Sequence, residues 1–226
     1  MFKLSKRLLS CANLVSSRNI IDVGTDHAKL PIWLVKNNII DNALACDITD
    51  FSINRSLHNV EKYNLTEQIK VVFSDGLSAI DQNYSDTIVI AGLGGETISE
   101  ILQKCRWENK KDKKFILQPT KSDLDLRIFL AKNGFIIESE RVVNDGKYSY
   151  STIVSKFTGS VFEFDDLYPF VGKILPCEES FNYVQKHIKY VEKIIKGTRI
   201  DGNIDSVKKM SIIHSKLENF LSQCRK

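Results

Sequence analysis

Between Asn19 and Lys156, short β-branched apolar runs alternate with longer amphipathic runs, and this alternation restricts the possible folds more than any other feature of the sequence. The short runs suit strands that are buried on both faces, and the amphipathic runs suit helices that cover a sheet. We predict strands over residues 20–23, 43–47, 70–73, 87–91 and 114–118, and helices near residues 29–37, 51–63, 96–105 and 122–132. The pattern favours an α/β fold with a mostly parallel sheet between two helical layers.

A hairpin is expected at the end of this sheet. The apolar segments 135–143 and 147–157 flank Asn144-Asp-Gly146, and an Asp-Gly pair between apolar runs is a strong hairpin signal. A parallel sheet that ends in an antiparallel hairpin is the strand arrangement of class I methyltransferases, whereas the sheet of a Rossmann-type dehydrogenase more often continues in parallel. The pattern therefore favours the Rossmann-like methyltransferase arrangement.

The chain is predicted to divide into three parts. Residues 1–159 hold the α/β domain with an N-terminal helix, and residues 160–176, where Pro and Gly interrupt the pattern, form a linker. Residues 177–226 form two helices with narrow apolar seams, separated by a break at 197–203, which predicts an antiparallel coiled-coil hairpin. The seam residues are Phe181, Val184, Ile188, Val191, Ile195, Val207, Met210, His214, Leu217, Leu221 and Cys224.

The charge of the chain is unevenly distributed. The formal net charge is +4, and residues 177–226 account for all of it, with ten Lys or Arg against six Asp or Glu. Such an excess permits a polyanionic partner and equally fits an ordinary solvated helix face. Near the N-terminus, Ser10, Cys11 and Asn13 interrupt the apolar stretch that follows Arg7, so we expect no export signal. No apolar run approaches the roughly 18 residues of a membrane helix, so we expect no membrane partner.

Cysteine usage also narrows the possibilities. The five cysteines are scattered and include no Cys-x-x-Cys pair, which argues against a disulfide framework or a zinc site and fits a reducing cytoplasm. His214 and Glu218 could form half of a metal site, but a histidine packed in the helical seam is the simpler interpretation. We therefore expect no metal. The sequence does not indicate an oligomeric state.

Residues 21–31 carry the strongest chemical signal. A predicted strand runs through Asp22 into a single glycine, Gly24, and then into a helix. A bare glycine lets a ligand approach the backbone, and amides ahead of a helix can bind a carboxylate or a phosphate. The Gly-x-Gly-x-x-Gly sequence that holds a pyrophosphate is missing, since Asp26 and Ala28 follow Gly24, and this argues against an NAD- or FAD-dependent oxidoreductase.

Acidic residues also end the next two predicted strands. Asp47 ends the second strand, where a carboxylate can accept hydrogen bonds from ribose hydroxyls, and Asp75-Gly76 follows the third, where it suits the edge of an adenine. Each acid alone could equally be a helix cap or a turn residue. Together with Asp22, however, they place three acids at the ends of three successive strands, where open α/β sheets bind ligands.

The last two parallel strands lead into loops that could complete the site. Ala91-Gly-Leu-Gly-Gly95 allows the backbone to line a cleft, although a tight turn into the next helix would have the same composition. The fifth strand ends in Gln118-Pro-Thr120, in which the proline stiffens the loop and Gln118 could contact the edge of a base.

These motifs resemble those of the bacterial tRNA (adenine-22-N1)-methyltransferases, and the resemblance extends over nearly the whole chain, including the helical tail. The pairing of Asp-x-Gly-x-Asp-His with Ala-Gly-x-Gly-Gly is much more specific than a generic methyltransferase signature. The matching segments are Leu4-Ser-Lys-Arg7-Leu8, Asp22-Val-Gly-Thr-Asp-His27, Leu30-Pro31, Ser74-Asp-Gly-Leu77, Ile90-Ala-Gly-Leu-Gly-Gly95, Leu117-Gln-Pro119 and Asp145-Gly-Lys147.

The resemblance implies S-adenosylmethionine as the methyl donor and N1 of adenine 22 in tRNA as the acceptor. It places the methionine part of the donor near Gly24, Thr25 and Gly92, the ribose at Asp47, and the adenine at Asp75-Gly76. The expected donor contacts are Asp22, Gly24, Thr25, Asp26, His27, Leu30, Asp47, Asp75, Gly76, Ala91, Gly92 and Leu93.

Four residues are expected to position the reacting groups, namely Asp26, His27, Gln118 and Pro119. For His27 we favour a role in bracing the loop over direct catalysis, and Asp26 either fixes the loop or contacts the amino group of the donor. Because N1 lies on the Watson–Crick edge, a paired target base must flip out before it reacts. An aromatic side chain could then stack on it, and the candidates are Tyr148, Tyr150 and Phe51. For Phe51 we favour packing in the core over stacking.

The tRNA contacts are expected in the N-terminal segment, in the glycine loop and on the first tail helix. Lysines on that helix recur at i+3 and i+4, so they share one face, which suits phosphates and equally suits solvent. The expected residues are Lys3, Lys6, Arg7, Gly94, Gly95, Lys186, Lys189, Lys193 and Lys196. Two alternatives stay open: a class I methyltransferase with a small-molecule or protein substrate, and a non-catalytic RNA-binding or scaffolding protein with this fold.

Overall fold

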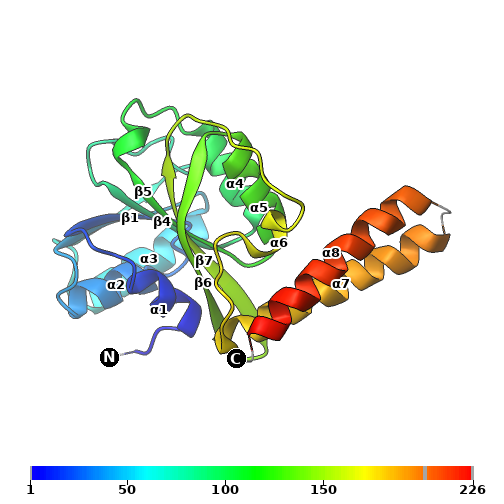
Figure 1. The fold of residues 1–226 in the computed structure, drawn as a ribbon. Helices are drawn as coiled ribbons and strands as arrows, with labels where there is room; N and C mark the ends of the chain where they lie inside the picture. Colours follow the sequence, from blue (N-terminus) through cyan, green and yellow to red (C-terminus); the bar gives the residue numbers. More distant parts are fainter. Residues whose placement is uncertain (1, 201–202, 225–226) are drawn as a thin grey trace.

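Residues 2–200 and 203–224 are described by a computed structural model (Figure 1). Its strands are β1 (Asn19–Val23), β2 (Asn42–Asp47), β3 (Ile69–Phe73), β4 (Thr87–Leu93), β5 (Lys114–Pro119), β6 (Phe135–Asp145) and β7 (Tyr148–Phe157). Its helices are α1 (Lys6–Ala12), α2 (Lys29–Lys36), α3 (Asp50–Lys62), α4 (Gly95–Lys104), α5 (Asp123–Lys132), α6 (Tyr168–Val171), α7 (Phe181–Ile200) and α8 (Ile204–Gln223), with short 3₁₀ turns η1 (Lys110–Asp112) and η2 (Glu178–Ser180).

Within these residues, seven strands form one sheet in the order β3-β2-β1-β4-β5-β7-β6. The pairs from β3 to β5 are parallel, whereas β7 runs antiparallel to both β5 and β6. The predicted Rossmann-like methyltransferase fold, mostly parallel with a terminal antiparallel hairpin, is confirmed. The hairpin is longer than predicted, because β6 continues to Asp145, which pairs with Tyr148 across a turn in which Gly146 has a φ of 63°.

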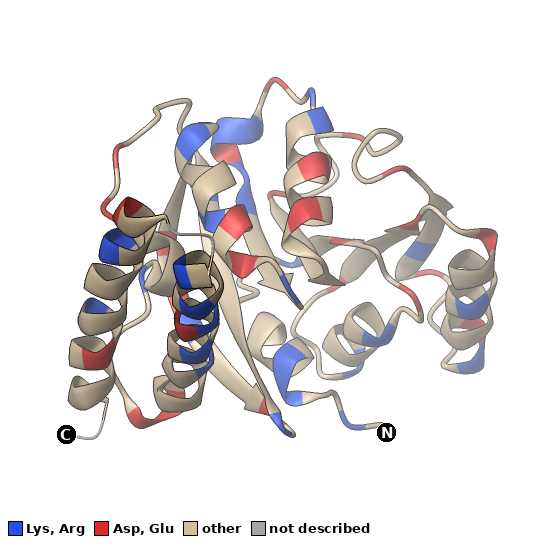
Figure 2. Cartoon of the chain, turned by 90° about the vertical axis from the view of Figure 1, so that its right-hand side faces the viewer, with Lys and Arg blue, Asp and Glu red and all other residues tan. Residues whose placement is uncertain are grey.

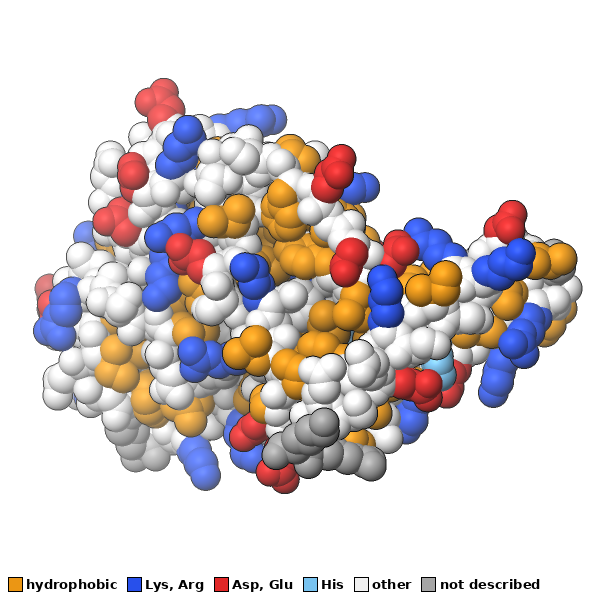
Figure 3. Space-filling model, in the orientation of Figure 1, with side chains coloured by type: hydrophobic (Ala, Val, Ile, Leu, Met, Phe, Trp, Pro, Cys, Tyr) orange, Lys and Arg blue, Asp and Glu red, His pale blue; other side chains and the backbone are white. Residues whose placement is uncertain are grey.

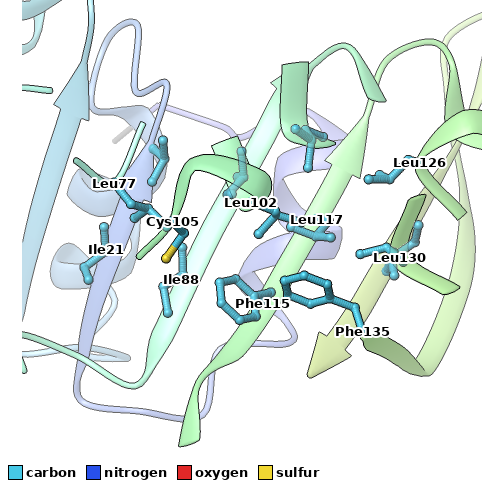
Figure 4. Packing of buried hydrophobic residues seen from close by; sticks show 14 of the residues in the cluster. Ile21, Leu77, Ile88, Leu102, Cys105, Phe115, Leu117, Leu126, Leu130 and Phe135 are labelled. Atoms are coloured by element: carbon cyan, nitrogen blue, oxygen red, sulfur yellow. The ribbon is translucent and has the colours of Figure 1, made fainter. Parts of the chain in front are cut away.

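Alternating side chains of the central strands supply two apolar layers, one beneath each set of helices. On β4, Ile88 and Ile90 pack with residues of α4 and α5, whereas Val89 belongs to the layer formed with α1, α2 and α3. Figure 4 shows the first layer, in which Leu102 and Leu126 lie over the sheet. Because helices cover both faces, a ligand reaches this sheet at the ends of its strands.

The position of the site follows from the strand order. β1 and β4 are neighbours in the sheet, although β2 and β3 lie between them in the sequence. Beyond β1 the chain continues into α2 on one face, and beyond β4 it continues into α4 on the other face. The two connections diverge and leave a crevice at the carboxyl ends of the strands, which is where open α/β sheets bind ligands.

The tail consists of α7 and α8, which lie side by side and project from the α/β part of the molecule (Figure 1). Residues of both predicted seams are buried, among them Val184, Ile188, Val191 and Leu217. The predicted break at 197–203 begins later than expected, since α7 continues to Ile200 and α8 begins at Ile204, while residues 201–202 lie outside the described residues. Gly197 is accommodated within the helix, where it has open space around it.

Segment 160–176, predicted as a linker, packs on the tail. Phe170, Val171 and Ile174 are buried in the same apolar cluster as Tyr183 and Val184 of α7. Among residues 2–200 and 203–224, no helix combines the length and the apolar character needed to span a membrane.

His214 bridges the two tail helices at the margin of their seam. Its Nε2 lies 3.4 Å from Oε1 of Glu192, and its Nδ1 lies 3.5 Å from Oε2 of Glu218. The side chain is only partly buried, so the histidine contacts carboxylates instead of packing fully between the helices. In the described part of the chain, no group of three or more potential metal ligands occurs.

Candidate active site

A cleft of about 1010 Å³ opens at the carboxyl ends of β1, β2 and β4, with α1 and the segment before it forming one wall. Most of the predicted donor-binding residues lie in its lining, although they come from the ends of three strands, the loop after β1 and the start of α2. These are Asp22, Gly24, Thr25, Asp26, His27, Leu30, Asp47, Ala91, Gly92 and Leu93, and the predicted tRNA contact Arg7 joins them.

Asp22 is the buried acid of the cleft. Its Oδ2 accepts a hydrogen bond of 2.6 Å from the hydroxyl of Thr25. Burial raises the pKa of Asp22 to about 6, the Thr25 hydrogen bond opposes this shift, and the charge of Asp47 adds to it. At neutral pH the carboxylate is therefore ionised, but it lies in surroundings that penalise its charge and favour a cationic ligand beside it.

The loop after β1 is held by β2. The amides of Gly24 and Thr25 donate to the carbonyl of Cys46 over 2.8 Å and 3.0 Å, so they are not free to bind an anion. Gly24 has a φ of 77°, and a Cβ at this position would lie 3.1 Å from Cδ1 of Leu93. The glycine thus lines the cleft with bare backbone, while its N–H is already bonded to Cys46.

Asp47 offers an unoccupied oxygen at the end of β2. Its Oδ1 accepts hydrogen bonds of 2.9 Å from both the amide and the hydroxyl of Thr49. These contacts orient the carboxylate and leave Oδ2 without a hydrogen bond from any residue in the described ranges. Such an oxygen is suited to accept from a pair of hydroxyls.

Asp75 and Gly76, the predicted adenine contacts, are not part of the cleft lining. Asp75 is half exposed, and its carboxylate lies 3.1 Å from Nζ of Lys104. Gly76 has a φ of 58° and accepts a hydrogen bond of 2.9 Å from the hydroxyl of Ser74. These two residues therefore flank the cleft beyond β3 and do not belong to its wall.

His27 is held mainly by two residues of α3, Asn59 and Arg55. The side chain of Asn59 donates to its carbonyl over 3.0 Å, Asp26 Oδ2 lies 3.3 Å from its Nε2, and Arg55 makes a very short contact with the same nitrogen. Desolvation lowers the pKa of His27; the charge of Asp26 opposes the shift, and the charges of Lys29 and Arg55 add to it. The lowered pKa favours the neutral imidazole, whose unprotonated Nε2 can accept from Arg55 but cannot donate to Asp26.

Sequence reasoning missed the contribution of α3 to this site. Ser52 and Asn59 line the cleft, and Arg55 lies 3.5 Å from Asp26 while its guanidinium stacks 4.8 Å from the ring of Phe51. The i, i+4 spacing of residues 51, 55 and 59 could have indicated one shared helix face. Phe51 is 69% exposed, so the expectation that it packs in the core is wrong.

Gly92 marks the side of the cleft opposite β2. Its φ is 84°, and a Cβ here would lie 2.9 Å from Nη1 of Arg7. Arg7 also donates from Nη1 to Oε1 of Gln118 over 2.9 Å, and the fully buried Gln118 donates from Nε2 to the carbonyl of Pro119. Arg7 and Gln118 are thus brought together, with the guanidinium held over bare backbone.

Gly94 and Gly95, predicted to contact tRNA, begin α4. A Cβ at Gly95 would lie 2.0 Å from the carbonyl oxygen of Ser122, and the Gly95 amide donates to the carbonyl of Lys121 over 2.9 Å. Close packing against the loop before α5 is therefore sufficient reason for a glycine at position 95. Neither glycine lies in the cleft lining, and the same holds for Gln118 and Pro119.

Among the remaining candidates, Lys3 also lines the cleft, whereas Phe51, the two tyrosines and the tail lysines do not. Tyr148 is 56% exposed and its ring centroid lies 6.2 Å from that of Tyr150, at the start of β7. The amide of Arg7 donates to Asp145 of the same hairpin over 3.3 Å, which places the hairpin tip beside α1. The four tail lysines are exposed on α7, where the basic residues follow one another along the helix (Figure 2).

Comparison with known proteins relates this arrangement to a group of enzymes. A family model described as a methyltransferase domain matches residues 4–153. The tRNA (adenine(22)-N(1))-methyltransferase of Bacillus subtilis is 33% identical over 155 residues, which are 68% of this chain and 65% of that protein. The chain therefore spans just under two thirds of the length of this relative in the match.

Solved structures are similar over nearly the full chain. A Streptococcus pneumoniae protein, provisionally named a tRNA (m1A22) methyltransferase and solved with S-adenosyl-L-methionine, is 30% identical with a TM-score of 0.77, over 94% of this chain and 100% of that one. TrmK of M. capricolum, solved with S-adenosyl-homocysteine, is 28% identical with a TM-score of 0.78, over 98% of this chain and 99% of that one. The structural likeness thus extends beyond residue 153 into the tail.

Proposed function

Since the chain belongs to the tRNA (adenine-22-N1)-methyltransferase family, we propose that it transfers a methyl group from S-adenosylmethionine to N1 of adenine 22 in tRNA. The observation that carries this proposal is the cleft between the carboxyl ends of β1, β2 and β4. There Asp22 and Asp47 lie beside the bare backbone of Gly24 and Gly92. Acids and glycines at such strand ends suit a nucleoside ligand.

The cleft residues fit this donor, which supplies an electrophilic methyl group on a positively charged sulfur. Oδ2 of Asp47 receives no hydrogen bond within the described residues and can accept from the ribose hydroxyls. The carboxylate of Asp22 is buried and forms no ion pair with any residue of 2–200 or 203–224, so it suits a cationic ligand. The proposed contacts are Asp22, Gly24, Thr25, Asp26, His27, Leu30, Asp47, Ala91, Gly92 and Leu93, with Asp75 and Gly76 at the adenine edge.

The acceptor places few chemical demands on the protein. Adenine N1 carries a lone pair that is unprotonated at neutral pH, and it forms the new N–C bond as the bond from the methyl carbon to sulfur breaks. No residue has to remove a proton from N1, so the work of the protein is to orient the base and exclude water. We assign this positioning to Asp26, His27, Gln118 and Pro119, with Arg7 on the acceptor side.

The tail is proposed to dock the tRNA. Lys189, Lys193 and Lys196 are exposed along α7 and can contact phosphates, and Figure 3 shows basic side chains standing on the projecting tail with acidic ones among them. We propose that residues 177–226 act as an RNA-binding antiparallel coiled coil joined through 160–176 to the methyltransferase domain 1–159, and that the enzyme works in the cytoplasm.

The decisive experiment identifies the methylated nucleoside. The full-length protein is incubated with labelled S-adenosylmethionine and either a tRNA transcript with adenine at position 22 or the same transcript with guanine there. Neutral digestion and chromatography with mass detection should give 1-methyladenosine from the first transcript and no product from the second. Alkaline steps are avoided because they convert 1-methyladenosine into the N6 isomer.

The other outcomes separate the alternatives. Donor binding without methylation of any tRNA would point to a methyltransferase with another substrate. Binding of tRNA with no binding of the donor would point to a non-catalytic RNA-binding protein. N6-methyladenosine as the first product would overturn the assignment of N1 as the acceptor.

A further inference from the structure

A buried polar network lies where the tail leaves the α/β part of the molecule. Arg127 of α5 is fully buried and donates from Nη2 to Glu140 of β6 over 2.7 Å and to the hydroxyl of Tyr183 on α7 over 2.5 Å. Its Nη1 donates to the carbonyl of Pro169 over 2.7 Å. Tyr183 in turn donates a very short hydrogen bond to Asp123 at the start of α5.

Asp123 extends the network along α7. Nε2 of His187 lies 3.4 Å from its Oδ2, and Nζ of Lys186 lies 3.7 Å from the same oxygen. Burial acts to raise the pKa of Asp123, but the His187 contact and the charges of Arg127 and Lys186 outweigh it and hold the pKa well below its ordinary value. The side chains of Asp123, Glu140 and Arg127 are therefore buried together at the base of the tail.

The turn after α6 packs directly against the buried Arg127–Glu140 pair. A Cβ at Gly172 would lie 2.2 Å from Oε2 of Glu140 and 2.8 Å from Nε of Arg127, and the amide of Lys173 donates to the same oxygen of Glu140 over 3.1 Å. The turn after α6 thus closes over the Arg127–Glu140 pair. Four segments contribute polar groups to the network, namely α5, β6, the turn at 169–173 and α7.

Stability alone does not explain such a cluster. Buried charges lose their hydration, so apolar side chains of similar volume often stabilise a junction equally well or better. An apolar surface is already present here, formed by residues such as Phe170, Val184 and Ile188. Hydrogen bonds require a defined distance and angle between their partners. The bonds of this network are therefore satisfied in one orientation of α7 against the sheet and are lost in other orientations.

We propose that the Arg127–Glu140–Tyr183–Asp123 network is a positioning device that fixes the direction in which α7 leaves the α/β part, and thereby places the docked tRNA relative to the cleft. This inference rests on the proposed role of the tail in docking tRNA. A substrate held at the tail and at the cleft reacts efficiently only if the two surfaces keep a fixed relation. The four residues do not line the cleft, so they act through the tail.

The first test compares two identical substitutions on one helix. Tyr183→Phe removes the hydroxyl at the centre of the network, whereas Tyr190→Phe changes an exposed residue of α7 that lies outside it. We expect Tyr183→Phe to raise the KM for tRNA about three- to tenfold, as for the loss of one hydrogen-bonded contact, while kcat and donor affinity stay unchanged. Tyr190→Phe should change none of these quantities.

A second variant separates an effect on the direction of α7 from an effect on the stability of the protein. Arg127→Met with Glu140→Met removes both charges of the pair and keeps apolar volume, so it should stay folded. Small-angle X-ray scattering should show a broader distribution of tail positions for this variant and for Tyr183→Phe than for Tyr190→Phe. Unchanged scattering in the folded double variant would overturn the positioning role. A changed distribution with an unchanged KM for tRNA would uphold it and refute the docking of tRNA on the tail.

Discussion

Arg7 in α1 donates a hydrogen bond of 2.9 Å to Gln118 at the end of β5, although the two residues are 111 positions apart. The same guanidinium lies against Gly92, where any Cβ would lie within 2.9 Å of Nη1. Helix α1 therefore closes one side of the cleft. It does so with the guanidinium of Arg7, which contacts the ends of β4 and β5.

Replacing Arg7 by Met should separate acceptor positioning from donor binding. The variant keeps an apolar stem but loses the hydrogen bond to Gln118, so we expect kcat with tRNA to fall about tenfold or more, the cost of one charge-assisted hydrogen bond. The dissociation constant for the donor should change little. Steady-state kinetics and calorimetric titration measure the two effects, with Arg106→Met, an exposed arginine after α4, as the control. A loss confined to donor affinity would contradict the assignment.

Asp47→Ala should weaken donor binding. Removal of the carboxylate takes away the oxygen that we expect to accept from the ribose hydroxyls, at a cost of roughly 1–3 kcal/mol. Calorimetric titration of the folded variant measures this cost directly. Asp112→Ala, which removes an exposed acid in η1, is the matched control. An unchanged affinity would show that the ribose does not lie at Asp47.

Donor affinity should depend on the protonation of Asp22. Burial raises its pKa to about 6, so the carboxylate is ionised at pH 7 and becomes neutral as the pH falls through about 6. Attraction for the cationic donor is then lost, and affinity should decline over that range. Titrations between about pH 5 and 8 should show this decline in the wild type, whereas Asp22→Asn should bind weakly and without it.

The same group has an opposite effect on the stability of the protein without donor. Because the pKa of Asp22 is higher in the folded state than its ordinary value of 3.8, the stability it contributes is fully present below that value and is lost as the pH rises to about 6. Asp22→Asn should therefore unfold at a higher temperature than the wild type at pH 7. A lower unfolding temperature would mean that the carboxylate is stabilised by partners other than Thr25.

Replacing lysines of the tail should change the affinity for tRNA and leave the affinity for the donor unchanged. Lys186 is paired with Asp123, so the exposed triple set Lys189, Lys193 and Lys196 is the sharper test. Their replacement by Ala should weaken tRNA binding and flatten its salt dependence, because fewer counterions are released, and should leave donor affinity unchanged. The control is the triple replacement of Lys36, Lys62 and Lys132, three exposed lysines that lie outside the tail on α2, α3 and α5.

Two results would bear on that interpretation. A folded Lys189, Lys193 and Lys196 variant with the wild-type affinity and salt slope would make these lysines a solvated face and would direct the search to Lys3 and Lys6. Deletion of residues 177–226 is a poorer test, because it removes Tyr183 and uncovers the apolar cluster around Phe170.

Much of the fold could be predicted because the signals are local. The alternation of Ile88, Val89 and Ile90 between two apolar layers is a property of any strand covered on both faces, and Asp145-Gly146 specifies a tight turn by its backbone preferences. The meeting of Asp22 and Asp47 in one cleft could be predicted as well, because the order of the strands brings both residues to the carboxyl edge of a parallel sheet.

The sequence by itself thus determined the strands, the helices and the edge at which the site lies, but only the tertiary structure decided the partners of the polar side chains. Arg55 against His27, Arg7 against Gln118, and Arg127 against Tyr183 are contacts between residues 28, 111 and 56 positions apart. An arginine in a solvated helix and an arginine buried in a network have the same local pattern. Its role is set by which surfaces pack together, and that depends on the whole fold.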